Sequence, residues 1–176
     1  MSTKGQEILS VFRYVQQVFM ETQRILLKMD NLMGPEWKTV YGNRITKEVT
    51  SSLVDPERWL VEAVFRIYEA EDKLVNKGIT ISFWGEIEEP VITAGKLVYS
   101  DIKSRDHWDL WNSWFLWNPH EETKKALDGA VVKYKPDEDN NITDVQVFSL
   151  PLVILENDND VESKIFRPLE KLKPSI

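Results

Sequence analysis

Cysteine is absent from this chain of 176 residues, and glycine and histidine are scarce. Without cysteine the chain can form neither a disulfide framework nor a thiolate metal site. The seven glycines are scattered, so there is no glycine-rich phosphate loop and no dinucleotide-binding fingerprint. The two histidines, His107 and His120, stand far apart, and no serine stands in a recognisable nucleophile elbow or triad context. These absences leave no recognisable catalytic motif.

Long apolar runs are also missing. No stretch approaches the ~18 consecutive apolar residues of a membrane span, and the first residues carry no apolar signal core. The formal net charge is −7, and the lysines and arginines are scattered. Nucleic acid is therefore not expected as a partner, because its binding rests on clustered positive charge. We expect a soluble cytoplasmic protein with no membrane association, no metal and no cofactor.

The chain does contain a long amphipathic pattern between residues 5 and 33. Three series of positions recur every seven residues, and they are apolar with one exception, Thr22. The series are Ile8, Val15, Thr22 and Met29; Val11, Val18, Ile25 and Leu32; and Phe12, Phe19, Leu26 and Met33. The pattern predicts one helix over 5–33 that ends at Gly34-Pro35. Its wide stripe fits packing on a globular core or contact with a second copy in a homodimer, and both remain open.

The segment from 37 to 78 carries mixed signals. Two short runs around Gly42-Asn43 indicate an edge hairpin within 37–50. Residues 55–57 resemble a helix start and 76–78 a helix stop, which favours a helix over 56–76. The alternation of apolar and charged residues after Val61 favours a strand instead. One helical turn followed by a strand over 61–69 satisfies both signals and is slightly favoured.

For the rest of the chain, strands are the main prediction. Alternating patterns predict strands over 79–88, 91–100, 130–135 and 142–155, with Gly95 as a candidate bulge and Pro151 at an edge or bulge. A short helix over 161–172 follows, capped by Asp160. Its inner side is formed by Ile165, Leu169 and Leu172.

Together these elements predict an α+β fold. A long N-terminal helix, a Trp-rich helix and a short C-terminal helix pack on an antiparallel sheet of about five to seven strands. We expect a single domain over 1–176, made of the helix 5–33 and a sheet-containing body over 37–176.

Four of the seven tryptophans lie three residues apart, at Trp108, Trp111, Trp114 and Trp117. On a helix this spacing spreads the indoles over about half of the circumference, which is wider than one core-facing stripe. They either fill the core or form a binding surface for a protein partner or small molecule. If 61–69 is a strand, Arg66 and Trp84 become further candidate binding residues, because an arginine framed by aromatic rings can hold a carboxylate or phosphate.

Candidate metal ligands are fewer. Glu86 and Glu88 share one face of the predicted strand 79–88 and could hold a divalent cation, although adjacent charges on an exposed sheet face need no metal. Asp158, Asp160 and Glu162 lack the glycine and the distant glutamate of a calcium loop.

We therefore expect a non-enzymatic cytoplasmic domain that binds a protein partner or small ligand through an aromatic surface. It would self-associate as a homodimer through the N-terminal helix. One alternative is a metal-dependent hydrolase or nuclease that uses Glu86 and Glu88. The other is a structural subunit of a larger assembly, which would expose a large apolar patch in isolation.

Overall fold

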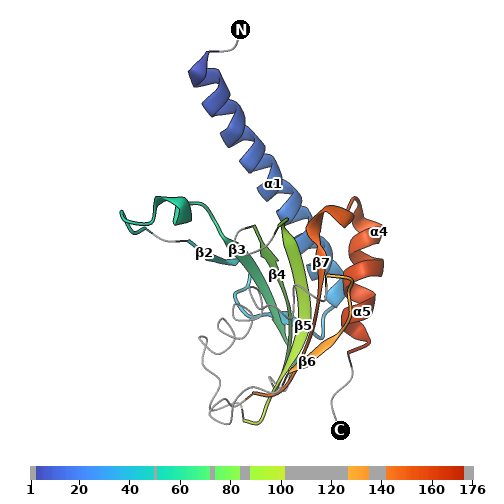
Figure 1. The fold of residues 1–176 in the computed structure, drawn as a ribbon. Coiled ribbons are helices and arrows are strands. Elements are labelled where there is room, and N and C mark those ends of the chain that lie inside the picture. The colour runs from blue at the N-terminus through green and yellow to red at the C-terminus, as the bar shows by residue number, and fades with distance from the viewer. Residues whose placement is uncertain are drawn as a thin grey trace.

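The computed structural model describes residues 3–49, 51–71, 74–83, 88–101, 127–134 and 142–172. In this part of the chain, helices pack against one antiparallel sheet (Figure 1). The predicted α+β class is thereby confirmed. The predicted Trp-rich helix lies outside the described residues.

The N-terminal helix α1 spans Lys4–Met33, close to the predicted bounds. It begins with a capping box, in which the backbone N of Gln6 donates to Thr3 Oγ1 (3.3 Å) and the backbone N of Thr3 donates to Gln6 Oε1 (2.8 Å). These bonds satisfy two backbone groups that a helix start otherwise leaves unpaired. The helix ends, as predicted, at Gly34, whose φ of 76° is accessible mainly to glycine.

The sheet runs in the order β1-β3-β4-β5-β7-β6, with β2 also paired to β3, and all these pairings are antiparallel. The strands are β1 (Lys38–Thr39), β2 (Thr46–Glu48), β3 (Ala63–Glu69), β4 (Val75–Ser82), β5 (Val91–Tyr99), β6 (Val132–Tyr134) and β7 (Ile142–Pro151). The strands predicted around 91–100 and 130–135 are therefore present, and the one predicted over 142–155 is present as far as Pro151, after which the chain forms a 3-10 helix. The strand predicted over 79–88 corresponds to β4, but β4 begins four residues earlier, at Val75, and ends at Ser82.

The hairpin predicted within 37–50 is wrong. β1 and β2 do not pair with each other but follow one another along the same edge of β3, with Lys38 opposite Glu69 and Thr46 opposite Phe65. The intervening residues, including Gly42 with φ 57°, form a break in that edge strand. The physical reason is that β3 offers each short run a longer and more buried edge than the runs offer each other.

The ambiguous segment follows the slightly favoured interpretation. A 3-10 helix, η1 (Pro56–Trp59), precedes β3. The helix stop predicted at 76–78 is wrong, because these residues lie inside β4, where Gly78 sits opposite Ile67 and Gly95. Strand pairing here outweighs the local turn tendency of Asn-Lys-Gly.

Two other details of the strands differ from the prediction. Gly95 is in regular register and is no bulge; a Cβ there would lie 2.5 Å from the carbonyl O of Gln146, so close approach of β7 demands glycine. The irregularity falls at Val98/Tyr99 instead. Pro151 is the last residue of β7, opposite Val91, where a missing N–H ends the strand without leaving a gap inside it.

The chain ends in one helical segment after the short 3-10 helix η3 (Leu152–Ile154). It consists of α4 (Asp158–Asp160), a π-helical turn η4 (Val161–Phe166) and α5 (Arg167–Glu170). Asn157, and not Asp160, is the N-cap: its side chain accepts from the backbone N of Asp160 (3.3 Å), whose carboxylate bonds back to the backbone N of Asn157 (3.2 Å). The wider π turn precedes Pro168, which has no N–H and whose ring would crowd an α-helical turn.

The core lies on both faces of the sheet. On the first face, the C-terminal half of α1 and the final helical segment pack on the strands, and the predicted inner residues Ile165, Leu169 and Leu172 are buried. The second face carries Phe65, Ile67, Leu97, Val145 and Val147. Three polar side chains of β4, Asn76, Thr80 and Ser82, are buried on that second face without a hydrogen-bond partner among the described residues.

Thr80 allows the energetic cost of one of these three polar side chains to be measured. Thr80→Val removes a buried hydroxyl that has no hydrogen-bond partner among the described residues, and it keeps the side-chain shape, so we expect the free energy of unfolding in urea to rise by about 1 kcal/mol. Thr93 faces Thr80 on β5, but its hydroxyl is bonded to that of Ser149 (2.8 Å). Thr93→Val should therefore destabilise by about 1 kcal/mol. Equal losses in the two variants would contradict this view of β4.

Candidate functional site

Helix α1 has two halves with different surroundings. In its C-terminal half, Ile25, Leu26, Met29 and Met33 are buried against the sheet. Residues 4–18, which we call the α1 arm, extend beyond the sheet, and Figure 1 shows this end of the helix rising out of the body. The same apolar stripe runs through both halves, so only part of it is covered within the described chain.

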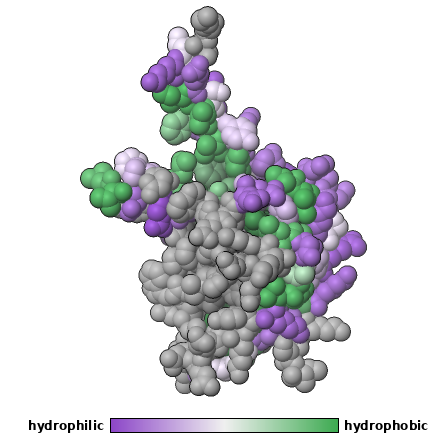
Figure 2. Space-filling view, viewed as in Figure 1, coloured by the Kyte–Doolittle hydropathy of each residue, from purple (hydrophilic) through white to green (hydrophobic). Residues whose placement is uncertain are grey.

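The α1 arm exposes large apolar side chains over a wide arc. Val11 is 63% and Phe12 59% exposed, and Figure 2 shows the hydrophobic colour along this helix above the body. The exposed set is Ile8, Leu9, Val11, Phe12 and Tyr14. With roughly 150–200 Å² per side chain, it presents on the order of 500 Å² of apolar surface. That is as large as the largest apolar patch of a typical monomer, and such patches mark interaction sites.

A second segment with exposed apolar side chains also projects from the body (Figure 1). Residues 51–60, between β2 and β3, carry Leu53 and Val54, each 84% exposed, and the half-exposed Trp59 and Leu60. Trp59 is oriented by a hydrogen bond from its Nε1 to the carbonyl O of Ser52 (2.6 Å). At the base of this segment Arg58 Nε donates to Glu62 Oε1 (2.6 Å). Apolar side chains on a braced segment are suited to contact with a partner.

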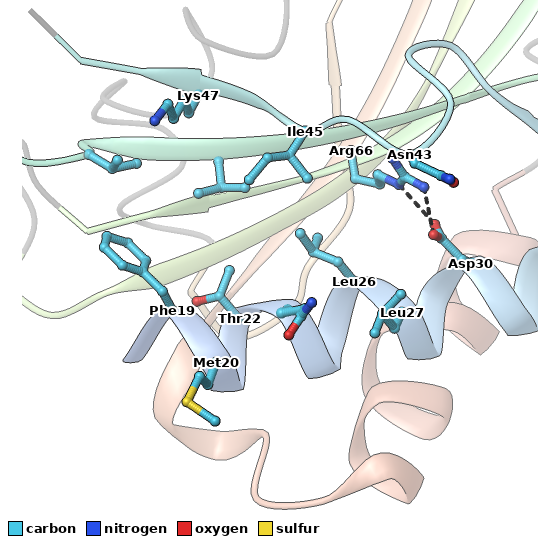
Figure 3. A pocket seen from close by; sticks show the side chains of 13 residues that line it. Phe19, Met20, Thr22, Leu26, Leu27, Asp30, Asn43, Ile45, Lys47 and Arg66 are labelled. Carbon is cyan, nitrogen blue, oxygen red and sulfur yellow. Dashed lines mark hydrogen bonds and ion pairs between the residues drawn. The ribbon is translucent and has the colours of Figure 1, made fainter. Parts of the chain in front are cut away.

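A groove of about 610 Å³ lies between the part of α1 that follows the arm and the neighbouring edge of the sheet (Figure 3). One wall is α1, and the other consists of the break in the edge strand, β2 and the start of β3. The α1 wall includes Phe19, Met20, Gln23, Leu26 and Leu27, and the facing wall includes Ile45, Lys47, Val61 and Val64. The lining is mainly apolar, so the groove suits an apolar occupant.

Arg66 closes the inner end of the groove with a hydrogen-bond network. Its Nε and Nη2 donate to the two carboxylate oxygens of Asp30 on α1 (2.9 and 2.6 Å). Its Nη1 donates to the carbonyls of Gly42 (2.6 Å) and Arg44 (2.8 Å), and the Tyr68 hydroxyl donates to Asp30 Oδ1 (2.8 Å). The carboxylate that Arg66 holds is thus the chain's own.

This network perturbs the two groups that it buries. Burial alone would lower the pKa of Arg66, but the hydrogen bonds and charge of Asp30 outweigh it and raise that pKa. For Tyr68, burial and the neighbouring Asp30 carboxylate both raise the pKa far above its ordinary value. Arg66 therefore stays charged and Tyr68 stays neutral, as the bonding pattern requires.

The structure describes only some of the other candidate residues. Trp84, Trp108, Trp111, Trp114 and Trp117 lie outside the described residues, as does Glu86. Glu88 is exposed in a bend after β4, and the described part of the chain contains no group of three acidic or histidine residues that could hold a metal. Nor does any helix in the described ranges have the length and apolarity needed to cross a membrane.

Sequence reasoning missed the groove, for which no local pattern gives a signal. For the exposed arm a signal was available in the length of the helix: 30 residues span about 45 Å, whereas a strand of nine residues spans about 30 Å.

Arg66→Met should destabilise the fold strongly. It leaves the Asp30 carboxylate and two backbone carbonyls without their donor, and breaking such a buried pair costs about 3–5 kcal/mol. Arg24 is the matched control, since it pairs with Asp158 at the surface (2.6 Å). Arg24→Met should cost less than about 1 kcal/mol. Urea denaturation measures both, and similar losses would show that the Arg66 network is not a structural centre.

Tyr68 should make stability fall at alkaline pH. Its pKa is raised in the folded state, so the unfolded chain loses this proton first, and the stabilisation is full below pH about 10 and declines above it. One such group contributes a slope of up to about 1.4 kcal/mol per pH unit. Tyr68→Phe should be less stable at neutral pH, because it loses a hydrogen bond, yet less sensitive to pH above 10. Parallel curves of thermal stability against pH would contradict this.

No protein-family model matches the chain, and no similar curated protein or solved structure was found. The function is therefore inferred from the α1 arm, the 51–60 segment and the groove.

Proposed function

We propose that this protein is a non-enzymatic interaction domain that associates with a second copy of itself through the exposed α1 arm. The observation that carries the proposal is the continuity of the apolar stripe of α1, which is mostly buried in residues 22–33 and exposed at Ile8, Val11 and Phe12 in the arm. The expectation of self-association through the N-terminal helix is thereby narrowed to one half of that helix.

The energetics favour a covered arm. An isolated helix of about 15 residues is marginal in water, and most helix stability in proteins comes from packing of the apolar face. On the order of 500 Å² of apolar surface, at about 25 cal/mol per Å², corresponds to roughly 12 kcal/mol of gross transfer free energy. Association itself costs an estimated 4–15 kcal/mol, so a second contact area is needed as well. The groove rim and the 51–60 segment supply it.

The groove favours an apolar segment over a charged small molecule. Its most buried cation, Arg66, has both carboxylate-facing donors on Asp30 and its Nη1 on two carbonyls. A carboxylate or phosphate ligand would therefore have to displace an internal partner. Apolar side chains, by contrast, can contact Phe19, Leu26 and Val64 without breaking any bond.

The tryptophan surface at 108–117 and Trp84 stay a prediction. They would give an interaction domain a second, aromatic contact area in addition to the α1 arm. The hydrolase alternative gains no support from Glu88, which stands exposed after β4.

The test is the mass of the protein in solution. In sedimentation equilibrium we expect wild type to self-associate reversibly. Val11→Glu/Phe12→Glu should raise the dissociation constant at least about 100-fold, since buried interface residues commonly contribute ≥2 kcal/mol each. Both side chains are exposed, so the fold should be unchanged by circular dichroism.

The matched control is Ser10→Glu/Gln17→Glu, which adds the same charge to the opposite, polar side of the same exposed arm. It should leave the dissociation constant within about threefold of wild type, because a surface charge away from a contact changes little. A wild-type protein that stays monomeric at high concentration, or equal effects of the two variants, would refute the proposal.

A further inference from the structure

The groove beside α1 needs an occupant that is apolar on more than one side. It has two walls, one formed by Phe19, Met20 and Leu27 of α1 and the other by Ile45 and Val61. Met20 and Leu27 remain more than half exposed at its rim, so the described chain leaves it open. A helix lying between these walls would need apolar side chains over a wide arc, at positions i, i+1, i+3 and i+4.

The α1 arm has this pattern. Ile8, Leu9, Val11 and Phe12 occupy those spacings, and all four are exposed. Residues 4–18 span about 22 Å as a helix, which is enough for four helical turns in a groove. A narrow seam would have sufficed for a simple two-stranded coiled coil, so the width of the arc favours a two-walled site.

The arm cannot enter its own groove. α1 is unbroken from Lys4 to Met33, and residues 6–33 contain no glycine or proline at which the helix could fold back. Because the groove is lined by the later part of the same helix, the arm points away from it (Figure 1). Any arm that fills the groove must come from another molecule.

A second copy of the chain supplies an apolar helix for the open groove and a groove for the exposed arm. The arm and the α1 wall of the groove are consecutive parts of one helix, so two α1 helices crossing antiparallel near Phe19 would place each arm in the other's groove. A two-fold axis then generates two identical contacts and leaves no open surface for further growth. The arms and groove rims together approach the ~800 Å² per partner of a standard interface.

From these observations we propose that the protein forms a two-fold dimer by reciprocal exchange of α1 arms, each seated in the groove of the other copy. This proposal rests on the proposed function and specifies its geometry. Antiparallel crossing near Phe19 brings Phe12 of one copy close to Leu27 of the other.

The absence of cysteine allows a direct test by cross-linking, because engineered thiols are the only ones present. We would prepare the full chain with Phe12→Cys, with Leu27→Cys and with both, at concentrations where each sediments as a dimer. A short bismaleimide bridges facing helices, whose axes lie about 8–10 Å apart. Within one chain the two positions are about 22 Å apart on a single helix, beyond its reach.

Reciprocal exchange predicts a covalent dimer for the double variant and little cross-linking for either single variant. A covalent dimer from Phe12→Cys alone would mean that the arms pair with each other in parallel. That result would overturn this inference but leave the proposed function standing. If the variants sediment as dimers but none of them cross-links, the placement of the arm in the groove is wrong. If the wild-type protein is monomeric, both the proposed function and this inference are refuted.

A mixing experiment provides the second measurement. Val11→Glu/Phe12→Glu damages the arm, whereas Met20→Glu/Leu27→Glu damages the exposed groove rim. Each alone should associate at least 100-fold more weakly than wild type, but an equimolar mixture contains heterodimers with one intact arm in one intact groove. Association in the mixture should therefore be at least tenfold tighter than in either variant alone. No recovery in the mixture would overturn reciprocal exchange, whereas weakening by the arm variant would still support the proposed function.

Discussion

The ion pair between Arg66 and Asp30 determines where α1 lies on the sheet. It joins the helix to β3, and the same guanidinium holds the carbonyls of Gly42 and Arg44 in the edge-strand break. Desolvating a charged pair is costly, so this arrangement is stable only because its donors are satisfied together. It fixes the distance between the two groove walls at their inner end, while their outer ends remain apart.

Length is the second constraint on the architecture. α1 is longer than any strand on which it packs, and the excess falls at its N-terminal end because Asp30 anchors the other end. The apolar stripe continues through the excess without a change of composition. The exposed arm is therefore built as part of the helix, with the same residue types that form the core three turns later.

The sequence predicts elements better than it predicts their neighbours. Heptad spacing located α1 and its end at Gly34, and alternation located β5 and β7. Periodicity identifies an apolar face but not what covers it, so the pattern itself does not show which half of α1 is buried and which is exposed. The failed hairpin around Gly42 and the helix stop at Gly78 have one cause: local turn tendencies were outweighed by pairing with β3 and β5. The sequence does not distinguish Asp160 from Asn157 as the N-cap, because both residue types are favoured there and only the folded backbone selects Asn157.

The candidate site was predictable only in part. The sequence predicts that Arg66 can hold a carboxylate, and it does hold one, but that carboxylate comes from Asp30, thirty-six positions earlier in the chain. No local pattern links these two residues, since the contact depends on how a helix crosses a sheet. The groove follows from the same crossing.

A continuous helix that is half core and half arm couples folding to assembly. Any partner that holds the arm in helical form also suppresses fraying toward Thr22 and Ile25, where the core begins. Binding to the native state alone adds a stabilisation that grows with the logarithm of the partner's concentration. For a chain that pairs with itself, the melting temperature then depends on its own abundance, so dilution alone weakens the fold.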